Sequence, residues 1–71
     1  MENMMEFELQ DDYIELYKLL KVMDIIHSGG GAKKLIEDEI VFRDGELETR
    51  KRAKITKGET ITIADISIKV I

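Results

Sequence analysis

The sequence predicts an α+β domain in which two short, antiparallel-packed helices lie against a small, largely antiparallel sheet of four to five strands. Residues 5–9 alternate apolar and acidic side chains, and residues 13–38 carry two amphipathic helical patterns. Residues 40–71 hold short β-branched runs separated by turn signals. Helices followed by a series of strands are typical of α+β architecture, and a chain of 71 residues has room for one core. We therefore expect a single domain over residues 1–71.

The first expected elements are a strand over about residues 5–9 and a helix over about residues 13–23. The strand is expected from its period-2 pattern, which is that of a half-buried strand. Asp12 is predicted to cap the helix, with Glu15 reaching back three residues later as in a capping box. The predicted buried stripe of this helix consists of Leu16, Leu19, Leu20 and Met23.

A second helix is predicted over about residues 29–38, with Ser28 as its N-cap. Serine is favoured at this position because its hydroxyl accepts a hydrogen bond from an early helix amide. Gly29, Gly30 and Gly31 follow, although glycine costs on the order of 1 kcal/mol relative to alanine in a helix interior. Two explanations are open: the glycines permit a sharp turn between closely packed helices, or they leave the amides uncovered for a phosphate at the positive end of the helix dipole.

A first hairpin is predicted around Asp44-Gly45, because this dipeptide supplies the positive φ angles of a type I′ turn. The resulting register places Phe42 opposite Leu47 and Arg43 opposite Glu46. Arg43 then either points outward and joins the basic surface or points inward and pairs with a carboxylate, for which Glu46 is the expected partner.

A second hairpin is predicted to close the chain. Residues 60–63 and 66–71 are rich in isoleucine and are joined by Ala64-Asp65, after a turn at Lys57-Gly58-Glu59. The alternation of side chains predicts that most of these isoleucines face the core.

Charge is segregated along the chain. The formal net charge of −4 and a pI of about 4.9 argue against a generic nucleic-acid binder. Residues 50–57 nevertheless hold a run of cations without an acid: Arg50, Lys51, Arg52, Lys54 and Lys57. Salt screens charges beyond about 8–10 Å, so a phosphate responds to this local patch more than to the total charge. The run is therefore either a solvated surface or a phosphate-binding one.

Several classes of function are not expected. The chain has no cysteine and one histidine, so we expect no metal site, and no carboxylate is accompanied by a nucleophile or a second catalytic group. We expect no enzyme activity, cofactor or small-molecule substrate. The apolar runs are too short to span a membrane, and Met1-Glu2-Asn3 lacks the positive start of a signal peptide. A cytoplasmic monomer is expected.

The motifs resemble the RNA-binding domain named for ribosomal protein S-four, also called the alpha-L RNA-binding motif. The resemblance lies in residues 28–36, in Val41 with Asp44-Gly45, and in residues 57–61. The small stand-alone bacterial members of the family share further segments, which are matched here by Tyr13-Ile14-Glu15-Leu16, Leu19-Leu20-Lys21, Ser28-Gly29-Gly30 and Glu48-Thr49-Arg50. The resemblance implies an RNA-binding face made of the two helices and the loop after the first hairpin. Its target would be structured RNA such as ribosomal or transfer RNA, with the ribosome as a partner, and no catalysis.

Three residues depart from the family pattern. Glu39 stands where the family usually has glycine, and Arg43 where it usually has a buried valine. Gly31 stands where the closest members tend to carry glutamate, and the sequence offers no reason for it.

With this resemblance, Arg50, Lys51, Arg52 and Lys54 become the predicted phosphate contacts. The same prediction extends to a second group: Lys33 and Lys34 beside the amides of Gly29 and Gly30, the capping Ser28, and Arg43 if it points outward. For Lys33 and Lys34 the alternative is pairing four residues along the helix with Glu37 and Asp38.

The aromatic residues Tyr13, Tyr17, Phe7 and Phe42 are expected to pack in or beside the core. No aromatic residue interleaves the basic run in sequence, which favours recognition of the backbone shape of folded RNA over base stacking. The rival function is a protein-interaction module whose basic run docks on an acidic partner or a ribosome-associated protein.

Overall fold

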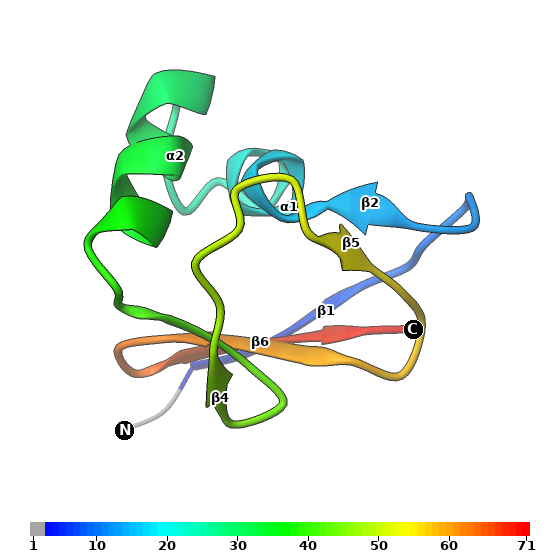
Figure 1. The fold of residues 1–71 in the computed structure, drawn as a ribbon. Helices are drawn as coiled ribbons and strands as arrows, with labels where there is room; N and C mark the ends of the chain where they lie inside the picture. Colours follow the sequence, from blue (N-terminus) through cyan, green and yellow to red (C-terminus); the bar gives the residue numbers. More distant parts are fainter. Residues whose placement is uncertain (1–2) are drawn as a thin grey trace.

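The computed structural model describes residues 3–71 and shows two helices on one face of a five-stranded sheet (Figure 1). In chain order the elements are β1 Asn3–Phe7, β2 Ile14–Glu15, α1 Leu16–Val22, α2 Gly29–Glu37, β3 Val41–Arg43, β4 Glu46–Leu47, β5 Lys54–Ile55, β6 Thr60–Ile63 and β7 Ile66–Val70. Met1 and Glu2, with which the predicted domain begins, lie outside the described residues. The predicted α+β class is confirmed. In Figure 1 the view runs along α1 and across α2, so the helix axes cross instead of running antiparallel as predicted.

The sheet has the strand order β1-β7-β6-β3-β4. It is largely antiparallel, as predicted, except that β1 pairs in parallel with β7. The N-terminal strand runs from Asn3 to Phe7 instead of over residues 5–9. Leu9 lies beyond its end but is buried, and its amide donates to the Ile71 carbonyl at 2.7 Å. Leu9 is therefore buried, as the alternating pattern predicts, although the strand begins and ends two residues earlier than expected.

The two predicted hairpins are both present. Phe42 pairs with Leu47 and Arg43 with Glu46 across the Asp44-Gly45 turn, where φ is 49° at Asp44 and 86° at Gly45. Positive φ at both central residues fits the predicted type I′ turn. In the second hairpin β6 pairs with β7, and its inward side chains are buried: Ile61, Ile63, Ile68 and Val70.

Helix α1 is shorter than predicted because its first expected turn is extended chain. Ile14 and Glu15 form β2, which pairs with β5 as a separate two-stranded sheet. The N-cap is Glu15, which makes no side-chain capping bond, so the predicted capping box of Asp12 and Glu15 is wrong. The amide of Leu16 instead donates to the Ala53 carbonyl at 2.9 Å. The amide of Tyr17, the second residue of the helix, donates to the Lys51 carbonyl, so a distant segment takes the place of a local cap.

Helix α2 begins as predicted. The Ser28 hydroxyl accepts a hydrogen bond from the Gly31 amide at 3.0 Å. A Cβ on Gly31 would lie 2.7 Å from the Ile26 side chain, so close packing against Ile26 explains this glycine. At the other end Glu39 has φ of 60°, the left-handed conformation that glycine adopts without strain. This backbone requirement accounts for the glycine that the resembling family carries there.

The core lies between the helices and the inner face of the sheet. Both helices contribute fully buried side chains: Leu16, Leu19, Leu20, Ala32 and Ile36. The strands supply Val41, Ile55, Ile61, Ile68 and Val70. The outer face carries the exposed Phe42 and Leu47, so the helices cover only one side of the sheet.

Candidate nucleic-acid interface

Residues 48–54, which comprise the loop between β4 and β5 and the first residue of β5, carry most of the basic run and are here named the basic loop. It rises from the sheet and crosses the start of α1 (Figure 1). The amide of Tyr17 donates to the Lys51 carbonyl at 3.1 Å, and Ala53, within the loop, is buried. Pairing of β2 with β5 fixes the end of the loop. These contacts tie the basic run to the first helix, although the two are far apart in sequence.

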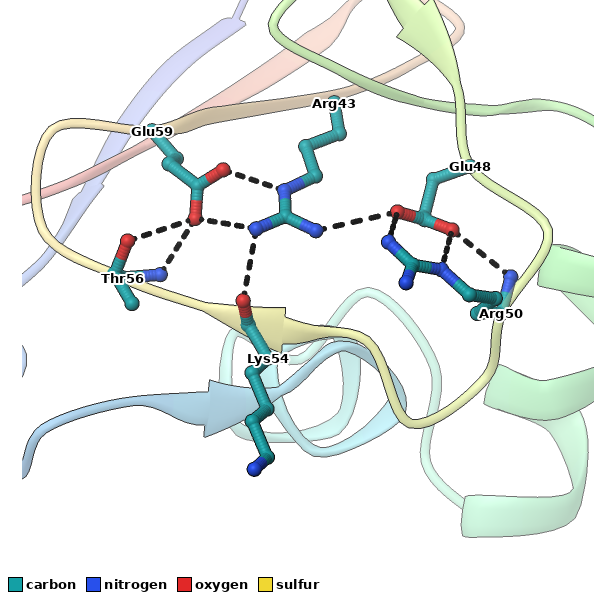
Figure 2. A network of polar contacts seen from close by, with 6 residues as sticks. All are labelled: Arg43, Glu48, Arg50, Lys54, Thr56 and Glu59. Atoms are coloured by element: carbon teal, nitrogen blue, oxygen red, sulfur yellow. Dashed lines mark hydrogen bonds and ion pairs between the residues drawn. The ribbon is translucent and has the colours of Figure 1, made fainter.

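Arg43 lies at the centre of an ion-pair network under the basic loop (Figure 2). Its Nε donates to Glu59 at 2.5 Å and its Nη2 to the other Glu59 oxygen at 2.9 Å. Nη2 also donates to the Lys54 carbonyl at 2.9 Å, and Nη1 to Glu48 at 3.3 Å. Arg43 therefore points inward and pairs with Glu59 and Glu48, so the predicted partner Glu46 is wrong. With its side chain only 23% exposed, Arg43 is better placed to hold the loop than to contact a phosphate.

Glu48 joins this network to Arg50. It accepts hydrogen bonds at 3.0 Å from Arg50 Nε, Nη2 and backbone amide, and its side chain is 9% exposed. These bonds from Arg50, with a further one from Arg43, lower the pKa of Glu48 to about 2 despite its burial. The carboxylate is thus charged at neutral pH and orients the Arg50 guanidinium at the edge of the loop.

Glu59 anchors the opposite side of Arg43. The bonds from Arg43 lower the pKa of Glu59, with a further contribution from the amide and hydroxyl of Thr56 at 2.7 and 2.9 Å. The same pairing, with Glu59 as the largest contributor, raises the pKa of Arg43. The network is therefore fully ionised at neutral pH and connects β3, the basic loop and the start of β6.

The predicted cations of the basic loop differ in their freedom. The side chains of Arg50 and Arg52 are 72% and 70% exposed. Arg52 lies 4.0 Å from Glu15, at the limit of an ion pair, whereas Lys51 forms an ion pair with Glu37 on α2. Arg52 and the exposed Lys54 are therefore the most available of these cations, Arg50 is held by Glu48, and Lys51 links the loop to α2.

Tyr17 joins the basic loop to helix α2. Lys33 Nζ lies 4.8 Å from the centre of the Tyr17 ring, and Arg52 Cζ lies 6.0 Å from it. Lys18 Nζ lies 5.9 Å from the same ring. A Cβ added to Gly29 would lie 3.9 Å from Tyr17 ring atoms, so the ring also borders the first residue of α2. Cations attracted to one aromatic ring from three segments are thereby gathered on one surface.

The start of α2 contributes two amides to this surface. The Ser28 hydroxyl and carbonyl accept bonds from Gly31 and Ala32, whereas no hydrogen bond within residues 3–71 uses the amide of Gly29 or Gly30. Free amides at a helix start can bind an anion. Ser28 therefore caps the helix and leaves the two predicted amides available.

The two lysines predicted beside these amides have different surroundings. Lys34 pairs with Asp38 at 3.0 Å, four residues along the helix, and this bond raises the pKa of Lys34. Lys33 lies over Tyr17, and Glu37, its partner in the alternative pairing, forms an ion pair with Lys51 instead. Lys33 thus belongs to the candidate site, and Lys34 lies at its margin.

We name the basic face as the surface formed by Lys33, Arg50, Arg52, Lys54 and the amides of Gly29 and Gly30. Part of it is a surface hollow of about 510 Å³, lined by Arg43, Arg50, Arg52, Ala53 and Lys54. Sequence reasoning found its cations but missed Glu48, Glu59 and the two tyrosines. The Glu48-Thr49-Arg50 segment was recognised only as a family match, and the position of Tyr17 depends on contacts between distant segments.

Within residues 3–71, no three acidic or histidine side chains are grouped so that they could hold a metal ion. None of the helices there has the length and apolar character needed to cross a membrane.

The fold and the basic face together define a small α+β domain that presents its helix pair and the basic loop on one charged surface. The family model of the S4 domain matches residues 7–71. The chain belongs to the S4 domain family, which confirms the resemblance found in the sequence.

Known relatives agree with this assignment. The chain is 42% identical over 59 residues to YbcJ of Escherichia coli (strain K12) and to YbcJ of Shigella flexneri. The matched residues are 83% of this chain and 84% of each relative. It is also similar to the solution structure of YbcJ from E. coli, with a TM-score of 0.75 and 42% identity, covering 100% of this chain and 91% of the other. That structure is described as revealing an alpha-L motif involved in RNA binding.

Proposed function

We propose that this chain binds structured RNA through the basic face and catalyses no reaction on it. The observation that carries the proposal is the meeting of two distant segments at Tyr17 of α1: helix α2, with Gly29 and Lys33, and the basic loop, with Arg52. Each segment offers hydrogen-bond donors, and together they make one surface suited to successive phosphates.

The chemistry of the basic face fits a phosphate backbone. Arg52 can place two parallel donors on phosphate oxygens, while Lys33 and Lys54 supply mobile point charges. Glu48 holds Arg50 in a defined orientation, so less side-chain entropy is lost when Arg50 binds a phosphate. The net charge of −4 implies that binding depends on this local surface and weakens steeply with salt.

RNA is the favoured nucleic acid because the related YbcJ structure is described as carrying a motif involved in RNA binding. A surface that holds phosphates suits the A-form duplex, which proteins recognise mainly through its shape and backbone. Family resemblance favours ribosomal or transfer RNA as the target, bound by a monomer in the cytoplasm. The rival is a basic face that docks on an acidic protein surface, such as that of a ribosome-associated protein.

Affinity for a folded ribosomal RNA hairpin, measured by fluorescence anisotropy at several salt concentrations, tests the proposal. Arg52→Ala/Lys54→Ala removes the two most available cations and leaves the Arg43 network intact. We expect weaker binding and a salt slope, d log K/d log [salt], that is shallower by roughly 0.7–0.9 per cation removed. Lys69→Gln is the matched control, because Lys69 is an exposed cation on the outer face of the sheet.

Three results would count against the proposal. Wild type with no affinity for RNA at low salt would exclude RNA as the ligand and favour the rival. An Arg52→Ala/Lys54→Ala variant that binds with the wild-type slope would exclude the basic face as the site. A Lys69→Gln variant that loses as much slope as the double variant would show that only total charge matters.

A further inference from the structure

Tyr13 lies beside the basic loop, although it is far from it in sequence. Pairing of Ile14 with Ile55 brings the residue before β2 next to β5. Lys54 Nζ consequently lies 5.1 Å from the centre of the Tyr13 ring. The ring is exposed, with 43% of the residue accessible, and Tyr13 is not part of the buried core.

The two tyrosines therefore differ in what they offer a ligand. Tyr17 is partly buried against the core and is surrounded by Lys18, Lys33 and Arg52. Tyr13 has one cation at its ring and is outside the core cluster. Tyr17 thus holds the cations of the basic face together, whereas Tyr13 lies at the edge of the basic face and is exposed.

A surface hollow of about 640 Å³ adjoins the Tyr13 ring. Ile14 and Lys18 line part of it, and the rest is lined by Gln10, Asp11, Asp12 and Glu15. Their carboxylates repel a phosphate, but they and the Gln10 carbonyl can accept hydrogen bonds from the amino groups of a nucleobase. Lys54, which contacts the same ring but does not line this hollow, suits a phosphate. The arrangement of ring, acceptors and ammonium thus matches the parts of one nucleotide.

We propose that Tyr13 is a stacking platform for one unpaired base of the RNA, whose phosphate is held by Lys54. This inference rests on the proposed function and makes it more specific. The preferred ligand is then a duplex flanked by an unpaired nucleotide, and not a continuous duplex, because a paired base is already stacked within its helix. Aromatic rings bind unpaired bases in this way with little dependence on sequence.

The test compares two RNA hairpins that share one stem closed by a non-nucleotide linker, so that neither has unpaired loop bases. One hairpin is blunt, and the other has two unpaired nucleotides at each end of the strand. We expect wild type to bind the extended hairpin at least about five-fold more tightly than the blunt one, since stacking on one aromatic ring is sufficient for such a gain. Tyr13→Leu should bind both hairpins equally, with the blunt-hairpin affinity and the salt slope of wild type, because no charge changes. Tyr13→Phe keeps the ring and should keep the preference.

A second measurement reports on stacking without relying on affinity. The chain has two tyrosines and no tryptophan, so the ring resonances of Tyr13 and Tyr17 can be told apart in a spectrum of Tyr17→Phe. A base stacked on Tyr13 should shift its ring protons upfield when the extended hairpin is added. The blunt hairpin should leave them nearly unchanged.

The outcomes separate this inference from the proposed function. Equal wild-type affinity for the two hairpins, or a preference that survives in Tyr13→Leu, would overturn the role of Tyr13 while leaving phosphate binding in place. Absence of binding to either hairpin at low salt would overturn both. Circular dichroism checks that Tyr13→Leu is folded. If that variant is unfolded, Tyr13→Phe tests the same role, because a Tyr13→Phe variant without the preference for the extended hairpin would exclude simple stacking.

Discussion

Replacing Glu48 by glutamine tests whether the Arg43 network holds the basic loop. Glu48→Gln keeps the shape of the side chain but removes the charge that accepts bonds from Arg50 and Arg43. The pKa of Glu48 is about 2 in the folded chain, against 4.5 for a free glutamate. A difference of that size corresponds to about 3 kcal/mol of stability at neutral pH. Because Arg50 is mostly exposed, water and salt screen part of this pairing, and we expect a loss of about 2 kcal/mol.

The pH dependence has a definite sign. A carboxylate whose pKa is lowered by folding stabilises the folded state above its unfolded pKa, and this contribution is lost as the pH falls toward the folded pKa. The difference in unfolding free energy between wild type and Glu48→Gln should therefore be largest near pH 7. It should shrink between about pH 4.5 and about pH 2.

Urea unfolding followed by circular dichroism over this pH range measures the difference. Glu46→Gln is the matched control, because Glu46 is an exposed glutamate on the same hairpin and forms no ion pair within residues 3–71. The control should change stability by less than about 0.5 kcal/mol. A Glu48→Gln loss that stays constant as the pH falls, or that is no larger than the control, would refute the network as the support of the loop.

Two further changes test the backbone of helix α2. Gly31→Ala should lower the unfolding free energy by about 1–3 kcal/mol, because the new Cβ would meet Ile26 at 2.7 Å. Gly30→Ala has open space around it and should raise the unfolding free energy by about 0.5 kcal/mol. Equal effects of the two variants in thermal melts would contradict the packing explanation. Glu39→Gly should raise the unfolding free energy by about 0.5–1 kcal/mol, because Glu39 has a φ of 60°, and Glu39→Ala should not give this gain since alanine is strained there as well. A larger gain from alanine than from glycine would show that charge, and not backbone strain, sets the cost.

The parts of the fold set by neighbouring residues could be predicted from the sequence. Asp44-Gly45 determines the first hairpin and its register, because a two-residue turn leaves no freedom in the pairing. Ser28 determines the start of α2 through a bond within its own first turn. The same local patterns located the cations of the basic face.

The parts that depend on distant segments could not be predicted. The pairing of β2 with β5 shortens α1 and places Tyr13 beside Lys54, and no local signal specifies it. For Arg43 the register was correct and the partner was wrong, because Glu59 immediately precedes β6, the strand that pairs with β3 on the side away from β4. Long charged side chains reach across several backbones, so their partners follow from the completed fold.

The most direct test of the central claim maps the RNA-binding surface by NMR. Adding a ribosomal RNA hairpin to the isotopically labelled chain should shift or broaden the backbone amides of Gly29, Gly30 and Arg52. The amides of Thr62 and Lys69, whose side chains lie on the outer face of the sheet, should change little. Changes confined to the outer face, or an unchanged spectrum at low salt, would contradict the assignment of RNA binding to the basic face.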